Sequence, residues 1–243
     1  MAVDLDDVTG VRKLLAGAGS VLFDFDGPIC RLFPDGSSKS VADELRETVD
    51  RFGAGDVLSV DERTHIDPHV VLRAVHRAAR RDPRLSRMVS LLEAQVTAGE
   101  VAAASTAELT LHVDTVVELL FGRGVRLAVV TNNSPVAAHA YLRDHGLIRY
   151  FSAVEGRRPN DPGLMKPHPD VVLRALDGLH LPPRRAVMIG DTGTDLQAAS
   201  RAGVSFIGYG RNDQKAEKLR DAGAEVVVGS YLPVLEGERG HGS

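Results

Sequence analysis

The chain has 243 residues, 43% of them apolar and 26% charged, so it can hold one large domain or a core domain with a smaller companion. Its formal net charge of -4 gives no basic field for nucleic acid, and it has no apolar run of about 18 residues that would cross a membrane. The acidic N-terminal stretch lacks the basic and apolar regions of a secretory signal, which favours a cytoplasmic protein. The single cysteine, Cys30, excludes an intramolecular disulfide and is expected to be an inert small hydrophobe.

The first predicted elements lead into an acidic turn. Apolar residues three and four apart predict a short amphipathic helix over residues 5–15, and residues 21–23 are typical of a buried strand. Asp24, Asp26 and Gly27 follow that strand directly. Because buried unpaired carboxylates are costly, these acids need a cation, an oriented donor or water. The alternative is that they only end the strand and begin a turn.

About 95 residues separate this turn from the next clear strand, which is too long for a loop in a compact domain. Apolar spacing predicts three helices in the interval, over residues 41–52, 68–82 and 84–99. Ser40 and Asp43 are placed to cap the first of them. With a return hinge at residues 99–106, we expect a helical cap at residues 31–105 and a core made of residues 1–30 and 106–243.

From Asp114 onward, helices and strands alternate. The predicted helices cover residues 114–122, 135–146, 169–176, 195–202 and 217–222, and the predicted strands cover residues 125–131, 152–154, 186–190, 204–208 and 225–228. Such alternation implies right-handed crossovers and an α/β fold with a doubly wound parallel sheet. The tail, residues 236–243, is expected to be disordered.

Polar residues follow three of these strands, and the carboxyl ends of parallel strands meet at one crevice. The residues expected there are Asp24 and Asp26 after the first strand, Thr131 and Asn132 after the second, and Asp191 and Asp195 after the fourth. Lys166 lies between the last two sets, in a segment that Pro167 and Pro169 hold extended. Each residue alone is ordinary, but their convergence at one sheet edge indicates a functional site.

Together these motifs resemble those of the haloacid dehalogenase superfamily, in its phosphoglycolate phosphatase-like branch with a helical cap. Asp24, Asp26 and Gly27 match the first motif, Thr131 the second, Lys166 the third, and Asp191 with Asp195 the fourth, over roughly residues 18–230. The resemblance implies a Rossmann-like core of this superfamily with a small inserted helical cap.

The resemblance also implies a phosphatase that hydrolyses a small phosphate monoester through an aspartyl phosphate. Asp24 would be the nucleophile, and Asp26 would protonate the leaving alkoxide and later activate water. Thr131, the backbone N–H of Asn132 and Lys166 would hold the phosphoryl group. The implied partner is a small phosphorylated metabolite, and the protein is expected to be a monomer or homodimer.

The implied cofactor is Mg²⁺, because three carboxylates at one crevice repel one another unless a hard cation lies among them. By similarity, the ion would take Asp24, the backbone carbonyl of Asp26 and Asp191. Asp195 would be in the outer shell or would steady Lys166. The metal would shield the phosphoryl group from the anionic nucleophile.

Asp26 narrows the choice of reaction within the superfamily. Dehalogenase relatives lack this acid, and phosphonate-cleaving relatives replace it and add a cap lysine, whereas the cap interval here contains only Lys39. A sugar-phosphate mutase of the β-phosphoglucomutase type keeps the acid and remains an alternative, as does a non-catalytic phosphatase-like binding module. Pro28 and the stretch 30–32 depart from the usual pattern after the first motif, so the substrate stays open, with phosphoglycolate as the nearest named guess.

Two basic features of the cap interval have simpler interpretations. His65 and His69 are four residues apart, but Asp67 and Pro68 break any helix between them, which disfavours a histidine metal site. A run of arginines is expected to form the solvated face of the second cap helix, with attraction of an anionic substrate as the alternative. The run consists of Arg73, Arg77, Arg80, Arg81 and Arg84.

Overall fold

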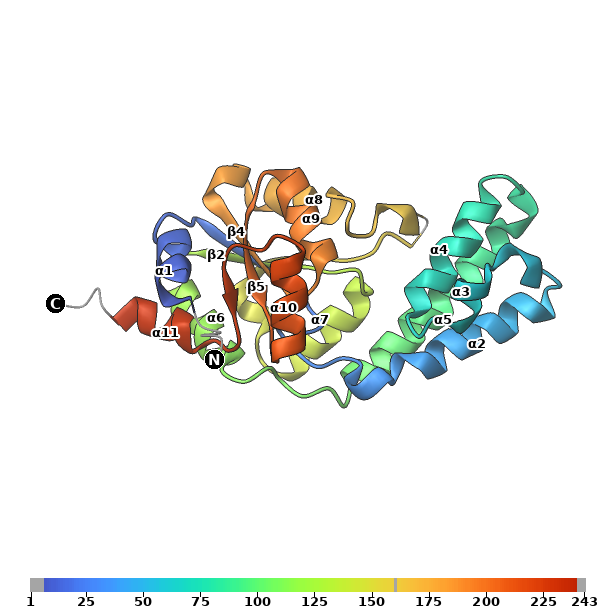
Figure 1. Ribbon diagram of the computed structural model, residues 1–243, viewed down its shortest axis with the longest axis horizontal. Helices are drawn as coiled ribbons and strands as arrows, with labels where there is room; N and C mark the ends of the chain where they lie inside the picture. The colour runs from blue at the N-terminus through green and yellow to red at the C-terminus, as the bar shows by residue number, and fades with distance from the viewer. Residues whose placement is uncertain (1–6, 160, 240–243) are drawn as a thin grey trace.

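The computed structural model describes residues 7–159 and 161–239, with side chains described as far as residue 235. A six-stranded parallel sheet with the order β3-β2-β1-β4-β5-β6 forms the core (Figure 1). The strands are β1 (Ser20–Phe23), β2 (Arg126–Val130), β3 (Phe151–Glu155), β4 (Ala186–Gly190), β5 (Ser205–Tyr209) and β6 (Val227–Val228). The predicted doubly wound α/β fold is confirmed.

Helices cover both faces of the sheet. In β1, Val21 and Phe23 enter one apolar layer and Leu22 enters the other. The first layer is covered by α1 (Val8–Ala16), α6 (Val113–Gly122), α7 (Pro135–Asp144) and α11 (Leu232–Arg239). The second is covered by α8 (Asp170–Leu179), α9 (Gly193–Ala202) and α10 (Asp213–Asp221). Burial on both faces explains why the strands are nearly continuous apolar runs.

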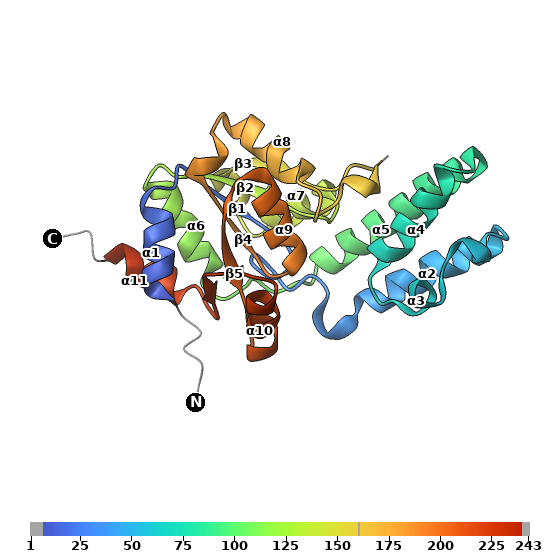
Figure 2. The same cartoon turned by 45° about the horizontal axis from the view of Figure 1, so that its top comes forward.

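A group of helices at one end of the molecule forms the cap (Figures 1 and 2). It consists of α2 (Ser38–Arg51), α3 (Val60–Thr64), α4 (Pro68–Ala79) and α5 (Ser86–Ala104). These helices have an apolar core of their own, in which Leu45, Leu72 and Leu92 are fully buried. The sequence did not predict α3, because a five-residue helix is too short to show an apolar period. A capping box between Ser59 and Glu62 starts it.

Two predictions about the ends of the cap helices are wrong. α5 continues through Gly99 to Ala104, so the predicted hinge does not begin at Gly99. A Cβ atom at Gly99 would lie 2.7 Å from the Val41 side chain, so the glycine allows α2 and α5 to pack closely. Ser40 and Asp43 do not cap α2: the Ser40 hydroxyl donates to the Ser37 carbonyl, and Asp43 pairs with basic neighbours on the helix.

Other element ends also differ from the prediction. α10 begins at Asp213, earlier than predicted, because the Asn212 side chain caps it by accepting from the Lys215 N–H. The expected disorder of residues 236–243 is wrong for residues 236–239, which belong to α11, while residues 240–243 lie outside the described part of the chain. Residues 5 and 6 of the first predicted helix also lie outside it. No helix in the described ranges combines the length and apolar character needed to span a membrane.

Candidate active site

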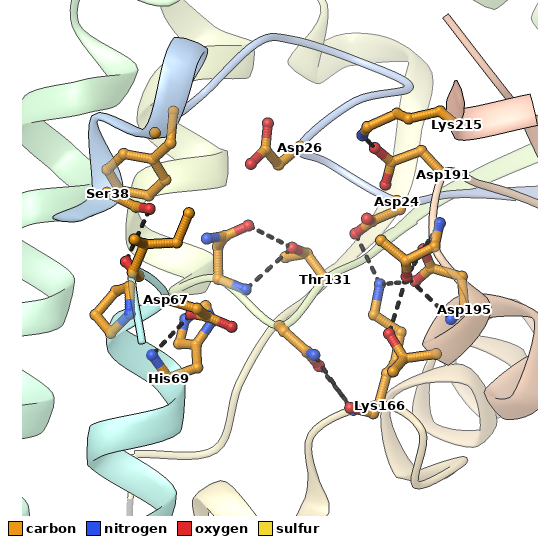
Figure 3. Close-up of a pocket in the computed structure, with 18 residues that line it drawn as sticks. Asp24, Asp26, Ser38, Asp67, His69, Thr131, Lys166, Asp191, Asp195 and Lys215 are labelled. Carbon is orange, nitrogen blue, oxygen red and sulfur yellow. Dashed lines mark hydrogen bonds and ion pairs between the residues drawn. The ribbon is translucent and has the colours of Figure 1, made fainter. Parts of the chain in front are cut away.

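The carboxyl ends of β1, β2 and β4 open into a cavity between the core and the cap. The cavity has a volume of about 340 Å³, and its core side includes Asp24, Asp26, Thr131, Lys166 and Asp191. Asn132 and Asp195 also line it, so all seven residues singled out from the sequence lie together. Figure 3 shows the cap residues Ser38, Asp67 and His69 facing this group from the opposite side.

Lys166 is the central cation of the core side. Its side chain is 2% exposed, and its Nζ lies 2.7 Å from Asp24 Oδ1 and 2.6 Å from Asp195 Oδ1. Nζ also donates to the Val130 carbonyl at 3.0 Å. Although burial lowers the pKa of Lys166, the carboxylates of Asp195 and Asp24 raise it above its usual value. Lys166 is therefore a permanent positive charge beside Asp24.

The Lys166 backbone is held from the end of β2. Its N–H donates to Asn132 Oδ1 at 2.7 Å, and Asn132 Nδ2 donates back to its carbonyl at 3.2 Å. Thr131 is buried, and its hydroxyl donates to Asn133 Oδ1 and accepts from the Asn133 N–H, each at 3.0 Å. These bonds join the loop after β2 and the Lys166 segment into one unit.

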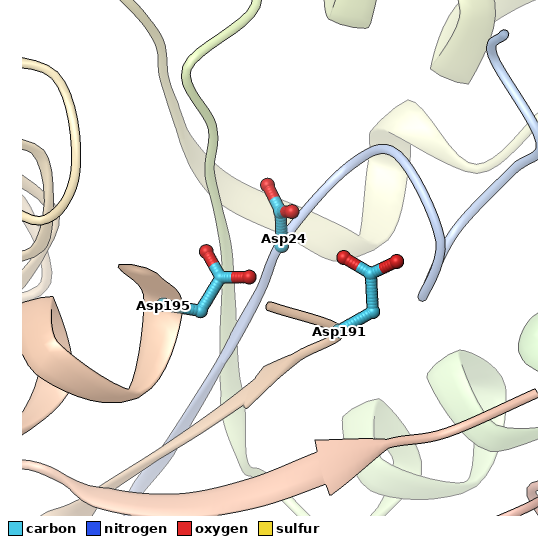
Figure 4. A group of neighbouring side chains, drawn as sticks. All are labelled: Asp24, Asp191 and Asp195. Atoms are coloured by element: carbon cyan, nitrogen blue, oxygen red, sulfur yellow. The ribbon is translucent and has the colours of Figure 1, made fainter. Parts of the chain in front are cut away.

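Three buried carboxylates that line the cavity lie close to one another (Figure 4). One oxygen each of Asp24, Asp191 and Asp195 lies within 4.8 Å of the others. Burial, followed by repulsion from Asp195, raises the pKa of Asp24 to about 7, and burial raises the pKa of Asp191 to about 6. Oxygen donors at this spacing suit a hard divalent cation, which relieves their mutual repulsion.

Asp26 and Gly27 form the turn after β1. Asp26 Oδ1 accepts from the Leu32 N–H at 2.9 Å, and burial raises the pKa of Asp26 to about 6. Such a pKa allows the carboxyl group to hold or release a proton near neutral pH. Gly27 has a φ of 110°, and a Cβ atom there would lie 2.5 Å from the Asp191 carboxyl carbon, so only glycine fits.

Lys215 is a cavity residue that the sequence analysis missed. It lies on α10, and its ammonium group pairs with Asp191 Oδ2. The sequence does offer one indication of the helix start: asparagine is a preferred N-cap residue, and the Asn212 side chain accepts from the Lys215 N–H. Because the helix was predicted to begin at residue 217, Lys215 was not placed near the sheet edge.

A buried ionic cluster beside the cavity was also missed. Arg157, in the loop after β3, lies 2.8 Å from Glu93 and 2.9 Å from Glu100, both on α5 of the cap. Glu100 also accepts from the Ser134 N–H, and His69 of α4 lies 2.9 Å from it. Such a cluster has no sequence motif, since its members come from three distant elements.

In this ionic cluster, neighbouring charges shift the pKa values of Glu100 and His69 in the direction opposite to the effect of burial. Burial raises the pKa of Glu100, but the hydrogen bond to His69 and the charge of Arg157 lower it to about 2. Burial lowers the pKa of His69, but Asp67 and Glu100 raise it to about 9. His69 therefore brings positive charge to the cap side of the cavity.

Of the arginines expected on the solvated face of the second cap helix, all except Arg73 are exposed. Arg73 is partly buried and donates to the Lys166 carbonyl at 2.7 Å, so the prediction is wrong for this residue. Arg77 pairs with Glu62, and Arg84 pairs with Asp82.

Cys30 is buried, and burial raises the pKa of its thiol far above the usual value, in line with a small hydrophobe.

Comparison with known proteins places this arrangement in a family context. A family model described as haloacid dehalogenase-like hydrolase matches residues 20–203. Phosphoglycolate phosphatase of Escherichia coli K12 is 34% identical over 142 residues, which cover 56% of this chain and 54% of the relative. The Salmonella typhimurium LT2 phosphoglycolate phosphatase is 32% identical over 139 residues, or 56% of this chain and 53% of the relative. The match thus spans about half the length of each relative.

Solved structures extend the likeness to the fold. The crystal structure of CbbY from Rhodobacter sphaeroides in complex with phosphate has a TM-score of 0.62 at 22% identity, covering 91% of this chain and 99% of that chain. This match includes both the sheet and the helical cap. Since the family model covers most of the sheet and the motif residues, the chain belongs to the haloacid dehalogenase-like hydrolases.

Proposed function

We propose that the protein is a Mg²⁺-dependent phosphatase that hydrolyses a small phosphate monoester through an aspartyl phosphate. The observation that carries this proposal is the position of the Lys166 ammonium group, 2.7 Å from Asp24 and 2.6 Å from Asp195 at the sheet edge. A carboxylate can attack an anionic phosphoryl group only where positive charge offsets the repulsion.

In the first step, the Asp24 carboxylate attacks phosphorus in line with the ester oxygen. The new bond joins the Asp24 carboxylate oxygen to phosphorus, while the bond to the ester oxygen breaks. Asp26 gives its proton to the leaving alkoxide, a role that suits its pKa of about 6. The alcohol then leaves.

In the second step, water attacks the aspartyl phosphate. Asp26 takes a proton from this water, the bond between phosphorus and the Asp24 oxygen breaks, and inorganic phosphate is released. Thr131, the backbone N–H of Asn132 and Lys166 hold the phosphoryl oxygens during both steps. The reciprocal bonds between Asn132 and the Lys166 backbone support this role because they fix both sides of the phosphate site.

The acidic cluster is the proposed magnesium site. Asp24 and Asp191 would hold the ion with the backbone carbonyl of Asp26, and Asp195 would steady Lys166. When bound, the ion supplies positive charge that reduces repulsion between the carboxylates and the phosphoryl group.

The proposed substrate is small and of the phosphoglycolate type. Both relatives described above bear the name phosphoglycolate phosphatase, and the cavity of about 340 Å³ suits a small metabolite. We also propose the division of the chain into a cap at residues 31–105 and a core on either side, because the cap helices have a separate apolar core.

Measurement of phosphate release tests the function. Phosphoglycolate, hexose phosphates and nucleotides would be supplied with and without Mg²⁺, and isomerised sugar phosphates would be monitored as well. We expect Mg²⁺-dependent release of phosphate, reduced about 10³-fold or more by Asp24→Asn. The control is Asp177→Asn, an exposed carboxylate on α8, which should keep full activity. An active Asp24→Asn variant would refute the nucleophile, and isomerisation without release would favour the mutase.

A further inference from the structure

A second cavity, which we call the junction cavity, lies between the cap and the core beside the segment that carries Lys166. Its volume is about 380 Å³. Its basic lining residues are Arg73, His76, Arg77 and Arg80 from α4 and its C-terminal end, Arg201 from α9, and His168. No carboxylate in the described part of the chain lines it. The junction cavity therefore concentrates positive charge from both units.

Neighbouring acids neutralise only part of this charge, and one of them, Asp67, acts on Arg73. Glu62 pairs with Arg77 at 2.7 Å, and Asp161 lies 3.7 Å from His76. Arg80 is exposed and has no ion-pair partner among the side chains of residues 7–159 and 161–235. Like charges held this close repel one another, and the repulsion costs free energy until an anion lies among them.

We propose that the junction cavity is a binding site for a small oligophosphate, a ligand with at least two linked phosphate groups. Arginine pairs with phosphate through two parallel hydrogen bonds, and four guanidinium groups exceed what a single carboxylate can engage. A diphosphate has enough oxygen atoms to reach arginines on both the cap side and the core side. The volume accommodates a ligand of that size.

Hydrogen bonds to backbone carbonyls connect the junction cavity with the active-site cleft, the first cavity described above, which contains Asp24. Arg73 donates to the Lys166 carbonyl at 2.7 Å, and Arg201 donates to the Pro167 carbonyl at 2.8 Å. The Lys166 side chain extends from the same segment to Asp24 in the cleft. A bound oligophosphate would thus hold α4 against the segment that positions Lys166.

Calorimetric titration of the full chain with inorganic pyrophosphate tests the proposal. The titration is done in EDTA, so that no divalent cation can bridge pyrophosphate to the carboxylates of the active-site cavity, which Lys166 and Lys215 neutralise only in part. We expect binding that weakens about tenfold or more in Arg80→Glu, which loses one cation and gains an anion. Arg201→Glu should cause a similar loss from the core side of the cavity.

The matched control is Arg12→Glu, which makes the same charge change at an exposed position on α1. It should leave the dissociation constant within about twofold, because charges beyond a Debye length are screened. Equal losses in Arg12→Glu and Arg80→Glu would show a general charge effect and overturn the site. Unchanged affinity in Arg80→Glu, or tighter binding of citrate than of pyrophosphate, would overturn it as well. The titration measures binding of pyrophosphate and not turnover, so its result is separate from any test of the proposed phosphatase activity.

Discussion

Gly27 is the point where the turn after β1 passes closest to the acidic cluster. Its φ of 110° disfavours any L side chain, and the Asp191 carboxyl group occupies the place of a Cβ atom. Both constraints act on the residue that follows Asp26. A methyl group here would therefore move one of two proposed catalytic or metal-binding carboxylates.

Gly27→Ala should reduce phosphatase activity at least about 10²-fold, because the clash displaces Asp191 or the turn that carries Asp26. Gly124→Ala is the matched control, since Gly124 also has a positive φ, of 77°, but a Cβ atom there meets nothing within 4 Å. The control should lose about 1 kcal/mol of stability and keep its activity. Equal activity losses in the two variants would contradict the steric explanation.

The sequence was sufficient to locate Asp24, Thr131 and Asp191, because each follows a strongly apolar strand and parallel strands end at one edge. Lys215 and Arg157 could not be found in this way. Lys215 faces the cavity only because α10 starts at Asp213, and helix ends are poorly determined by apolar spacing. Arg157 pairs with residues more than 50 positions away, and such pairings leave no local pattern.

At the scale of elements, the ionic cluster fastens α5 of the cap to the loops after β2 and β3. Arg157 is completely buried and bonds to Glu93 and Glu100, and Glu100 also accepts from Asn133 Nδ2 at 3.0 Å and from the Ser134 N–H at 2.8 Å. Removing one partner from a buried cluster leaves the other charges unpaired. The contact between cap and core therefore depends on this cluster.

Glu100→Gln should lower the free energy of unfolding by about 3 kcal/mol, because it removes a fully buried charge that Arg157 and His69 need. Urea denaturation measures the change. Glu44→Gln, at an exposed position of α2, is the control and should change stability by less than about 0.5 kcal/mol. A loss in Glu100→Gln no larger than that of the control would contradict the role of the cluster.

The stability difference between the wild type and Glu100→Gln should depend on pH. The folded-state pKa of Glu100, about 2, is below its usual value, so its contribution is present above pH 4.5 and is lost as the pH falls toward 2. The folded-state pKa of His69, about 9, is above its usual value, so its contribution is present below pH 6.5 and is lost as the pH rises through 9. Urea denaturation should show the largest difference near pH 6 and smaller ones at pH 3 and pH 10. A difference that stays constant over this range would count against the assigned charges.

At the scale of the whole molecule, the alternation of helices and strands was enough to predict the doubly wound sheet, because each apolar run needs cover on both faces. The cap was predicted from the length of its interval, but α3 and the full length of α5 were not. α5 packs against α2 and α4 of the cap and also against α7 of the core, so its end is set by tertiary contacts. Gly99 could not be interpreted from the sequence for the same reason, since it allows close helix packing only because Val41 of α2 lies against it.

Magnesium should stabilise the whole protein. Burial raises the pKa values of Asp24 and Asp191, so their charged forms destabilise the folded state at pH 8 until a cation offsets them. Mg²⁺ at about 100 times its dissociation constant should add about 2.7 kcal/mol, a rise in Tm of several degrees. Asp191→Asn should lose most of this rise in thermal unfolding experiments, while Asp177→Asn should retain it. The same rise in both variants would place the ion elsewhere.

The central position of β1 has a consequence for biosynthesis. β1 is the first strand among the residues that the structure describes, but it pairs with β2 and with β4, which begins only at Ala186. The Tyr231 hydroxyl also donates to the Pro28 carbonyl at 2.8 Å, next to the turn that carries Asp26. A growing chain on the ribosome therefore exposes β1 and Asp24, the proposed nucleophile, long before Lys166, Asp191 and Tyr231 are made. We expect nascent chains to remain without turnover until Tyr231 has been made, and to need protection from aggregation meanwhile.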